Sequence, residues 1–216
     1  MKLPLLETII LPAPRPDTGK SLTGALQERK TIREISDRKL SLQMISNLLW
    51  AACGINREQG PFGIPGRTAA SASNSQEIEV YVVLPDATYL YDPFHHTLTP
   101  VVAGDLRSLT IGPGQADFVV NAPVHLVYVA DINKLANTAG YQEPGLTDPE
   151  VQKSYYFVDT GLIAGNASLF AASEGLASWF HNCNKPALAL KLKLRPHQRA
   201  LFGHSFGYIQ KTEQEQ

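Results

Sequence analysis

The spacing of apolar residues predicts two helices of the protein core. In the first, Ser41 is placed as N-cap, and Gly54 is placed to end the helix in the left-handed conformation. Its apolar stripe consists of Leu42, Ile45, Leu48, Leu49 and Ala52. The second runs from Tyr155 to Leu176 without a proline, and we expect it to be the central helix of the fold. Because Gly161 and Gly165 lie one turn apart, they would let another helix approach closely, which predicts a role in a subunit interface.

Alternating and continuous apolar runs predict the strands. Ile78 to Leu84 places every second apolar side chain on one face, and Val124 to Ala130 has the pattern of a second, buried strand. Thr88 to Thr99 resembles a hairpin that turns at Asp92-Pro93, and a last strand is expected at Leu201 to Ile209. Shorter helical segments are expected at residues 21–27, with Ser21 or Thr23 as cap, at residues 184–192, and as a helical turn at residues 115–121.

Proline and glycine mark the segments between these elements. Leu11 to Lys20 contains three prolines, which fix φ and remove hydrogen-bond donors, so we expect an extended arm and not a core element. Arms of this kind often lie across a partner subunit. Ile55 to Gly66 mixes glycine and proline with polar residues, and we expect a mobile loop of the kind that often flanks ligand sites. We therefore divide the chain into an arm, residues 1–20, and a single domain, residues 21–216.

Length and charge narrow the class of protein. The chain has 216 residues and is 44% hydrophobic, which is enough for a large core in one domain. Its 19 Lys and Arg against 20 Asp and Glu give a net charge of -1, which argues against a general nucleic-acid binder and against a membrane-surface protein. Cys53 and Cys183 form no CxxC motif, so neither a disulfide framework nor a structural zinc site is predicted.

The start of the chain predicts a cytoplasmic protein. Leu3 to Leu11 is apolar, but Pro4 and Glu7 interrupt it, and it is far shorter than a membrane span. It does not read as a signal peptide. We expect a reducing compartment, with an export signal removed from ahead of residue 1 as the alternative.

Two familiar catalytic or binding motifs do not hold up in this sequence. Gly203-His204-Ser205-Phe206-Gly207 matches the nucleophile elbow of α/β-hydrolases, but only nine residues follow it and none is a histidine, so no triad can be completed. We expect its glycines to leave space in a strand where neighbouring groups pack closely. No Gly-x-Gly-x-x-Gly joins a strand to a helix, which argues against a dinucleotide fold.

The histidines do not predict a metal site. His95 and His96 are adjacent, so in a strand they would point to opposite faces and could not chelate one metal ion. We expect them to be surface histidines. The other histidines show no metal-ligand spacing.

The basic segment, residues 29–33, concentrates three cations and a hydroxyl in a chain that is nearly neutral. In an extended conformation its two arginines and Thr31 would share one side, where they would suit an anion such as phosphate. The alternative is a solvated turn in which the flanking residues Glu28 and Glu34 partly neutralise the cations. On its own the segment leaves both interpretations open.

A run of small and hydrogen-bonding residues, Arg67 to Gln76, leads directly into the predicted strand at Ile78. Because the run has no bulky side chain, its backbone could approach a flat ligand closely. A serine-rich linker is an equally open interpretation.

Taken in order, these segments resemble the nitroreductase family of FMN-dependent oxidoreductases, and within it the branch similar to SagB-type azoline dehydrogenases. The resemblance covers roughly residues 20 to 209. The basic segment resembles the family's Arg-Arg-Ser-x-Arg motif, residues 48–57 and 67–72 resemble the branch's next two motifs, and residues 159–176 resemble its central helix. The resemblance implies an α+β fold with a mostly antiparallel central sheet flanked by helices, in a domain-entwined homodimer.

The resemblance also implies a binding site for FMN. Arg29, Lys30 and Thr31 would hold the phosphate and ribityl chain, and Arg33 would lie near the N1–C2=O edge of the ring, where positive charge stabilises reduced flavin. A turn after the central helix would present a backbone N–H to flavin N5. The other implied site residues are Ala70, Ser71, Ala72 and Asn74 along the ring, and Phe180 and His181 in that turn.

The sequence departs from the family pattern at several of these positions. Ala70 stands in place of the usual proline, and Lys30 and Thr31 stand in place of arginine and serine. Arg199 and Lys211 are only loose counterparts of the C-terminal basic residues that often touch the phosphate. These differences would weaken the binding of the FMN phosphate but would not abolish the site.

The activity implied by the resemblance is hydride transfer from NAD(P)H through flavin N5 to a small organic acceptor of nitroaromatic or quinone type, by a ping-pong mechanism. Such a mechanism needs neither a protein nucleophile nor a metal ion. Two alternatives stay open: a SagB-like azoline dehydrogenase that acts on a peptide, and a flavin-binding protein without turnover. No segment of the chain resembles a peptide-docking module.

Overall fold

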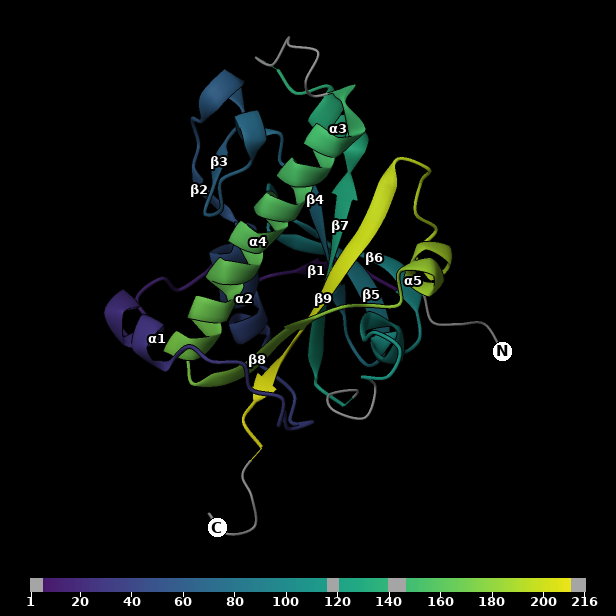
Figure 1. Cartoon of the computed structure of the whole chain (residues 1–216). Helices are drawn as coiled ribbons and strands as arrows, with labels where there is room; N and C mark the ends of the chain where they lie inside the picture. Colours follow the sequence, from purple (N-terminus) through teal and green to yellow (C-terminus); the bar gives the residue numbers. More distant parts are fainter. Residues whose placement is uncertain (1–5, 116–120, 140–146, 211–216) are drawn as a thin grey trace.

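A seven-stranded antiparallel sheet forms the centre of the computed structural model, which describes residues 6–115, 121–139 and 147–210 (Figure 1). Its strands lie in the order β1 (Ile9–Ile10), β6 (Thr97–Ala103), β5 (Ala87–Asp92), β4 (Ile78–Val83), β7 (Val124–Asp131), β9 (Gln198–Tyr208) and β8 (Leu176–His181). All neighbouring pairs are antiparallel. The predicted α+β fold with a mostly antiparallel central sheet is confirmed.

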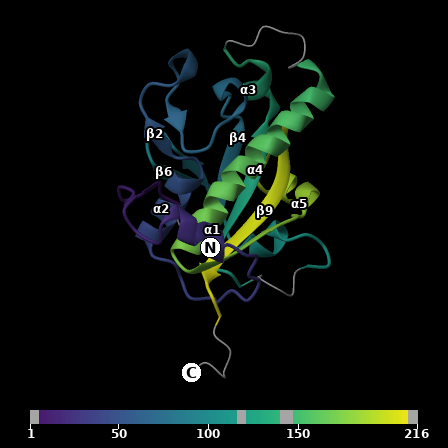
Figure 2. The same ribbon diagram turned by 60° about the vertical axis from the view of Figure 1, so that its left-hand side comes forward.

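Helices cover both faces of this sheet. They are α1 (Leu22–Glu28), α2 (Leu42–Cys53), α3 (Ile132–Ala136), α4 (Pro149–Ser173) and α5 (Lys185–Lys191), with short 3₁₀ turns η1 (Pro61–Gly63), η2 (Ala72–Asn74) and η3 (Arg107–Thr110). The larger hydrophobic core lies between one face and the helices α2 and α4, and Figure 2 shows α4 running diagonally across the strands. A smaller core on the other face contains Leu188 and Leu192, from α5 and the residue after it.

The alternation along β4 explains how one strand serves both cores. Ile78, Val80 and Val82 belong to the core beneath α2 and α4, whereas Tyr81 and Val83 belong to the opposite core. Successive side chains of a strand point to opposite faces, so the pattern in the sequence was sufficient to predict this arrangement.

Helix α2 is confirmed, but Leu42, predicted on its apolar stripe, is 41% exposed, and its C-cap residue was predicted in the wrong conformation. Ser41 caps the helix by accepting a hydrogen bond from the backbone N–H of Met44 at 3.1 Å. Gly54 has φ -72°, so the helix does not end in the left-handed conformation. Glycine is required here for space, because a Cβ at Gly54 would lie 2.5 Å from Cδ1 of Trp50.

The central helix α4 is confirmed with shifted ends. It begins at Pro149, earlier than predicted, because Asp148 caps it and proline is well suited to the first helical position. It ends at Ser173, and Leu176 already belongs to β8. A Cβ at Gly161 or Gly165 would meet no atom within 4 Å, so no helix of the described part of the chain packs against the glycine pair.

The loop predicted at residues 55–66 is largely a hairpin. Strand β2 (Ile55–Arg57) pairs with β3 (Gly66–Arg67), and the turn between them contains η1. Side chains from the following run hold it: the Asn74 amide donates to the carbonyl of Ile64 at 3.1 Å, and the Gln76 amide donates to the carbonyl of Pro65 at 2.7 Å. The strand pair at its two ends was not predicted, because these contacts come from residues outside the segment, and the mobility of the loop stays a prediction.

The N-terminal segment is extended and packs along its own chain. Ile9 and Ile10 pair with β6, and Leu11 is buried in the larger core. The buried hydroxyl of Ser46 in α2 donates to the carbonyl of Pro12 at 2.5 Å and lies 2.7 Å from Nε2 of His96. His96 is therefore half-buried and bonded, so the prediction that it is a surface histidine was wrong, whereas His95 is exposed.

The remaining predicted elements agree with the structure. The hairpin at residues 88–99 is formed by β5 and β6, the strands at residues 124–130 and 201–209 are β7 and β9, and the short helices at residues 21–27 and 184–192 are α1 and α5. The helical turn predicted at residues 115–121 lies mostly outside the described residues.

Candidate functional site

The basic segment lies beside the edge strand β8, directly after α1. The backbone N–H of Ile32 donates to the carbonyl of Ser178 in β8 at 3.0 Å. A little further on, Ile35 pairs with Ile209, and the N–H of Ser36 donates to the carbonyl of Tyr208 at 2.9 Å. Backbone contacts on both sides therefore fix where the cations of this segment lie.

The cations of the basic segment have no acidic partners among the described residues. The side chains of Arg29, Lys30 and Arg33 are exposed, and no ion pair involves any of them. Glu28 forms an ion pair with Lys20 instead, and Glu34 forms none. The flanking glutamates do not neutralise the segment, so its positive charge is available to an anion.

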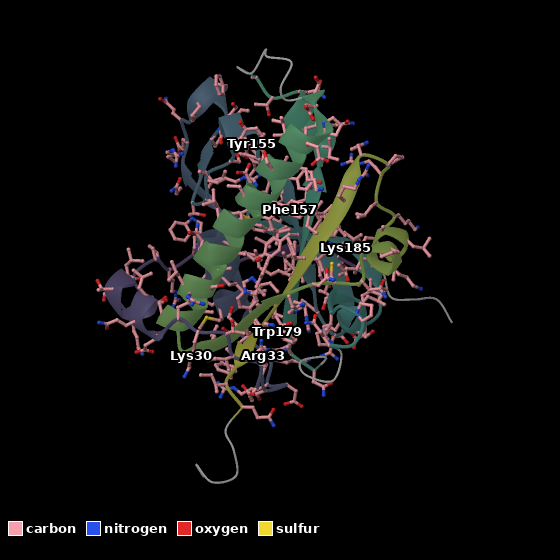
Figure 3. All side chains as sticks on the ribbon, viewed as in Figure 1. Lys30, Arg33, Tyr155, Phe157, Trp179 and Lys185 are labelled. Carbon is pink, nitrogen blue, oxygen red and sulfur yellow. The ribbon has the colours of Figure 1, made fainter. Side chains whose placement is uncertain are left out.

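Aromatic rings support two of the nearby arginines. Cζ of Arg33 lies 5.1 Å from the ring centroid of the buried Trp179, and Figure 3 shows the two side chains next to each other. Cζ of Arg38 lies 3.6 Å from the ring centroid of Tyr208. A cation over an aromatic face keeps its N–H groups free to donate. These contacts therefore hold each guanidinium in place and leave its hydrogen-bond donors available to a ligand.

Phe180 and His181 lie in strand β8, and the prediction that they form a turn was wrong. The chain turns earlier, at Glu174 and Gly175, where Gly175 adopts φ +68°. Glycine adopts this conformation without strain, so α4 can end here. The helix therefore ends before Phe180 and His181, which the resemblance placed in the turn after it. The ring of Phe180 is 37% exposed and packs 4.8 Å, centroid to centroid, from Phe202.

A buried polar network lies behind His181. Its Nδ1–H donates to the carbonyl of Asn182 at 2.9 Å, because a carbonyl can only accept, so Nε2 accepts from the hydroxyl of Ser205 at 2.7 Å. Ser205 also lies 2.9 Å from Nδ1 of the fully buried His125. The serine of the Gly-x-Ser-x-Gly motif is thus a buried structural residue, which agrees with the rejection of a hydrolase.

The predicted ring-lining residues belong to η2 and its approach. The backbone N–H of Ala72 donates to Oδ2 of Asp159 in α4 at 2.8 Å, and the hydroxyl of Ser71 accepts from the N–H of Gln76 at 3.0 Å. The Asn74 amide is directed into the β2–β3 hairpin. Ala70 is exposed. The run is therefore braced by its own polar side chains, which leaves its backbone and small side chains toward the surface.

The two halves of the predicted site are attached to different elements of one chain. The small-residue run is attached to α4 at Asp159, through the N–H of Ala72, and at Asn166, whose amide donates to the carbonyl of Thr68 at 3.2 Å. The basic segment is attached to Ser178 in β8, the strand that follows α4. Figure 1 shows the hairpin β2–β3 and helix α1 near opposite ends of α4.

Arg199 lies at the far end of β9 from the basic segment. Its guanidinium donates to the carbonyls of Pro196 and Gln198. Roughly 30 Å of extended strand separates it from Tyr208, the residue of β9 nearest the basic segment. Lys211 lies outside the described residues.

A pair of buried carboxyl groups lies beneath η2, and no sequence pattern predicted it. Glu77 and Asp159 are 0% and 3% exposed, and Glu77 accepts from the hydroxyl of Ser75 at 2.6 Å. Burial raises the pKa of both groups, and it raises that of Glu77 to about 7, helped by the neighbouring Asp159 charge. Only their convergence in space, from positions far apart in sequence, distinguishes them from ordinary surface acids.

Buried titratable groups predict a stability maximum near pH 6.5. Burial lowers the pKa of His125 to about 3 and also lowers those of His181 and His204. The unfolded chain binds these protons near pH 6.5, so folding stability should fall as pH drops below that value, by about 1.4 kcal/mol per pH unit for each extra proton. Glu77 has the opposite sign: stability falls as pH rises from about 4.5 to about 7.

Urea unfolding at a series of pH values between about 5 and 8 checks this prediction. Below pH 6.5 the three histidines affect the free energy of unfolding more than the two carboxyl groups do. Stability should therefore change more steeply with pH on the acid side of the maximum. In the Glu77→Gln variant, folding stability should no longer decrease as pH rises toward 7, but it should still decrease as pH falls below 6.5. A protein more stable at pH 5 than at pH 6.5 would contradict the assignment.

No helix among the described residues has both the length and the apolar content needed to span a membrane. Within the same residues, no group of three or more His, Cys, Asp or Glu side chains could hold a metal ion.

The fold and the basic segment together describe an α+β protein with exposed positive charge beside an antiparallel sheet. Comparison with known proteins identifies the class: residues 26–208 match the Nitroreductase family. A crystal structure of a nitroreductase from Ralstonia eutropha JMP134 is 36% identical, with 95% of this chain and 90% of that chain covered and a TM-score of 0.82. The chain belongs to the nitroreductase family and is an oxidoreductase of that family.

More distant relatives agree with this assignment. A protein of Methanocaldococcus jannaschii that carries a nitroreductase name is 26% identical over 164 residues, which cover 73% of this chain and 76% of that protein. The Escherichia coli microcin synthetase McbBCD complex with truncated pro-MccB17 contains a chain with the same fold. That chain is 20% identical, with a TM-score of 0.65 and coverage of 91% of this chain and 77% of its own length. Members of the family typically bind flavin.

Proposed function

We propose that the protein is a homodimeric, FMN-dependent oxidoreductase that uses NAD(P)H to reduce a small organic acceptor of nitroaromatic or quinone type. The observation that carries this proposal is the basic segment: three exposed cations without acidic partners in the described part of the chain, fixed by backbone contacts beside β8. Family membership makes a flavin phosphate the fitting anion.

The residues of the basic segment fit a flavin mononucleotide. Arg29, Lys30 and Thr31 would bind the phosphate and ribityl chain, because a guanidinium fork, an ammonium and a hydroxyl are suitable donors to phosphate and hydroxyl oxygens. Arg33 would supply positive charge to the edge of the ring, and its position over Trp179 holds that charge in place. When bound, FMN would accept hydride from NAD(P)H at N5 and pass it to the acceptor.

The site would be completed by a second protomer. Because residues 29–33 are attached to β8 and residues 70–74 to the middle of α4, we infer that one flavin would contact the two segments from different chains. In a homodimer the basic segment of one protomer would meet the small-residue run of the other. This arrangement would use both predicted halves and exclude water from the ring between them.

Exposed apolar residues of α4 support such a dimer. Val158 and Leu162 are 59% and 43% exposed, and a Cβ built at the neighbouring Gly161 or Gly165 would meet no atom of the described residues within 4 Å. Isolated apolar residues on a surface are ordinary, but several on one helix beside two glycines match a close helix–helix interface.

Replacing Leu162 with glutamate should convert the dimer to a monomer and release FMN. A charge buried at an interface without a partner is strongly unfavourable, and the composite flavin site needs both chains. Size-exclusion chromatography with light scattering measures the first effect, and flavin content measures the second. Val101→Glu, at a similarly exposed position on β6, is the matched control and should stay dimeric. A dimeric Leu162→Glu variant would place the interface elsewhere.

The purified protein tests the function directly. It should be yellow, release FMN on denaturation, and lose its flavin colour anaerobically with NADH or NADPH. A colourless protein that takes up no FMN would overturn the cofactor assignment. Bound FMN that neither nicotinamide reduces would favour an azoline dehydrogenase or a binding protein, and a screen of nitroaromatic, quinone and azoline substrates would then separate these.

A further inference from the structure

Strands β4 and β5 diverge at one end and leave a cavity between them. Their pairing runs from Val83 opposite Thr88 to Tyr81 opposite Leu90, and no pairing joins the earlier residues of β4 to the last residues of β5. A cavity of about 270 Å³ lies at this divergence. Its walls include Ile78 and Val80 from β4 and the aromatic residues Tyr91 and Phe94 from β5 and the turn after it. The cavity therefore has a largely apolar wall.

Four charged side chains also line this cavity, and three of them have partners. Nζ of Lys134 lies 2.8 Å from Oε1 of Glu79, and Oδ2 of Asp92 lies 2.6 Å from Nδ1 of His95. Arg67, from β3, is the fourth. Its guanidinium forms no ion pair or hydrogen bond with any described residue, and its Nε is buried without a partner. The cavity thus has one uncompensated positive charge.

The nearby buried acids do not compensate Arg67. Glu77 and Asp159 share with it the wall of a smaller void, but neither forms an ion pair with it. Oε2 of Glu77 accepts from the hydroxyl of Ser75, and Oδ2 of Asp159 accepts from the backbone N–H of Ala72, whereas Oε1 of Glu77 is buried without a partner among the described residues. A half-buried guanidinium without a counter-ion is unfavourable unless an anion is supplied.

We propose that this cavity is a second ligand site, separate from the flavin site, which binds a small organic monocarboxylate through Arg67. A guanidinium fork matches the two oxygens of a carboxylate, and the apolar wall would bury the rest of the ligand. The volume is just below the ~300 Å³ of the smallest usual ligand pockets, so the ligand is small. A dianion such as phosphate fits less well, because Glu79 and Asp92 are close and Arg67 supplies only one charge.

Calorimetric titration of the purified protein with hexanoate, and with hexanamide as its neutral counterpart, tests this site. Hexanoate should bind saturably, once per chain, in the millimolar range or tighter, and hexanamide at least ~10-fold more weakly. The flavin absorbance should not change during the titration. Equal binding of the two compounds, no saturable binding, or a parallel change in flavin absorbance would overturn the proposal.

Substitutions locate the binding within the structure. Arg67→Gln should weaken hexanoate binding at least ~10-fold. Arg57→Gln is the control, because Arg57 lies on the paired strand β2, is exposed, and carries the same charge. If Arg67→Gln does not fold, Arg67→Lys retains the charge without the fork and should bind several-fold more weakly than the unmodified protein. Unchanged affinity in the folded Arg67 variants would overturn the proposal even if hexanoate binds. Because none of these measurements requires turnover, failure of the flavin assignment would leave them interpretable.

Discussion

Replacing Arg29 with alanine is expected to weaken FMN binding by about 10- to 100-fold. A hydrogen bond to a charged group contributes about 1.5–3 kcal/mol, which corresponds to that range of affinity. The Arg29 side chain is exposed and has no partner among the described residues, so its removal should leave the fold intact. Titration of the flavin-free protein with FMN, followed by flavin fluorescence, measures the change.

The matched control for this variant is Arg199→Ala. Arg199 has the same charge and is also exposed, but it lies at the far end of β9 and bonds to local carbonyls. Its removal should leave FMN affinity nearly unchanged. Raising the salt concentration should weaken FMN binding less in Arg29→Ala than in the unmodified protein, because one screened charge contact is gone. Equal FMN affinity of the two variants would show that the phosphate site is misplaced.

Replacing Gly203 with alanine is expected to destabilise the fold by about 3 kcal/mol or more. A Cβ at this position would lie 2.2 Å from the carbonyl oxygen of Thr110 and 2.6 Å from Cε1 of His181. The first is backbone, and the second belongs to a side chain held by Ser205, so neither can move away easily. Thermal unfolding should show a melting temperature lower by roughly 6–12 °C for a chain of this size.

Gly24→Ala is the control for that prediction. Gly24 lies in helix α1, where a Cβ would make only ordinary contacts, at 3.4 Å from Lys20 and Ser21. Alanine is a better helix former than glycine, so the variant should be unchanged or more stable by up to ~1 kcal/mol. If Gly203→Ala were as stable as Gly24→Ala, the close packing of η3 against β9 would be refuted.

Local pattern determined a large part of the fold. The stripe of α2 and the alternation of β4 were readable because each depends on the repeat of a single element. The order of the basic segment, the small-residue run and the central helix was enough to indicate the nitroreductase family. The family match over residues 26–208 supports that resemblance.

Contacts between segments that are distant in sequence determined the conformations and element boundaries that the apolar pattern did not predict. Gly54 was expected to be left-handed, but the ring of Trp50 sets its role. Residues 55–66 form a hairpin because Asn74 and Gln76 hold it from outside. Phe180 lies in a strand because the chain turns at Gly175, a boundary that composition does not fix.

The features of the candidate sites can likewise be separated into those that the sequence determined and those that depend on the tertiary structure. The sequence by itself determined the presence of a basic segment, because three cations in five residues are a local property. Only the tertiary structure decided that these cations have no acidic partners among the described residues, that the small-residue run is attached to α4, and that Arg67 faces a cavity without a counter-ion from the described part of the chain. Charge compensation depends on distances between side chains that are remote in sequence, and those distances exist only once the chain has folded.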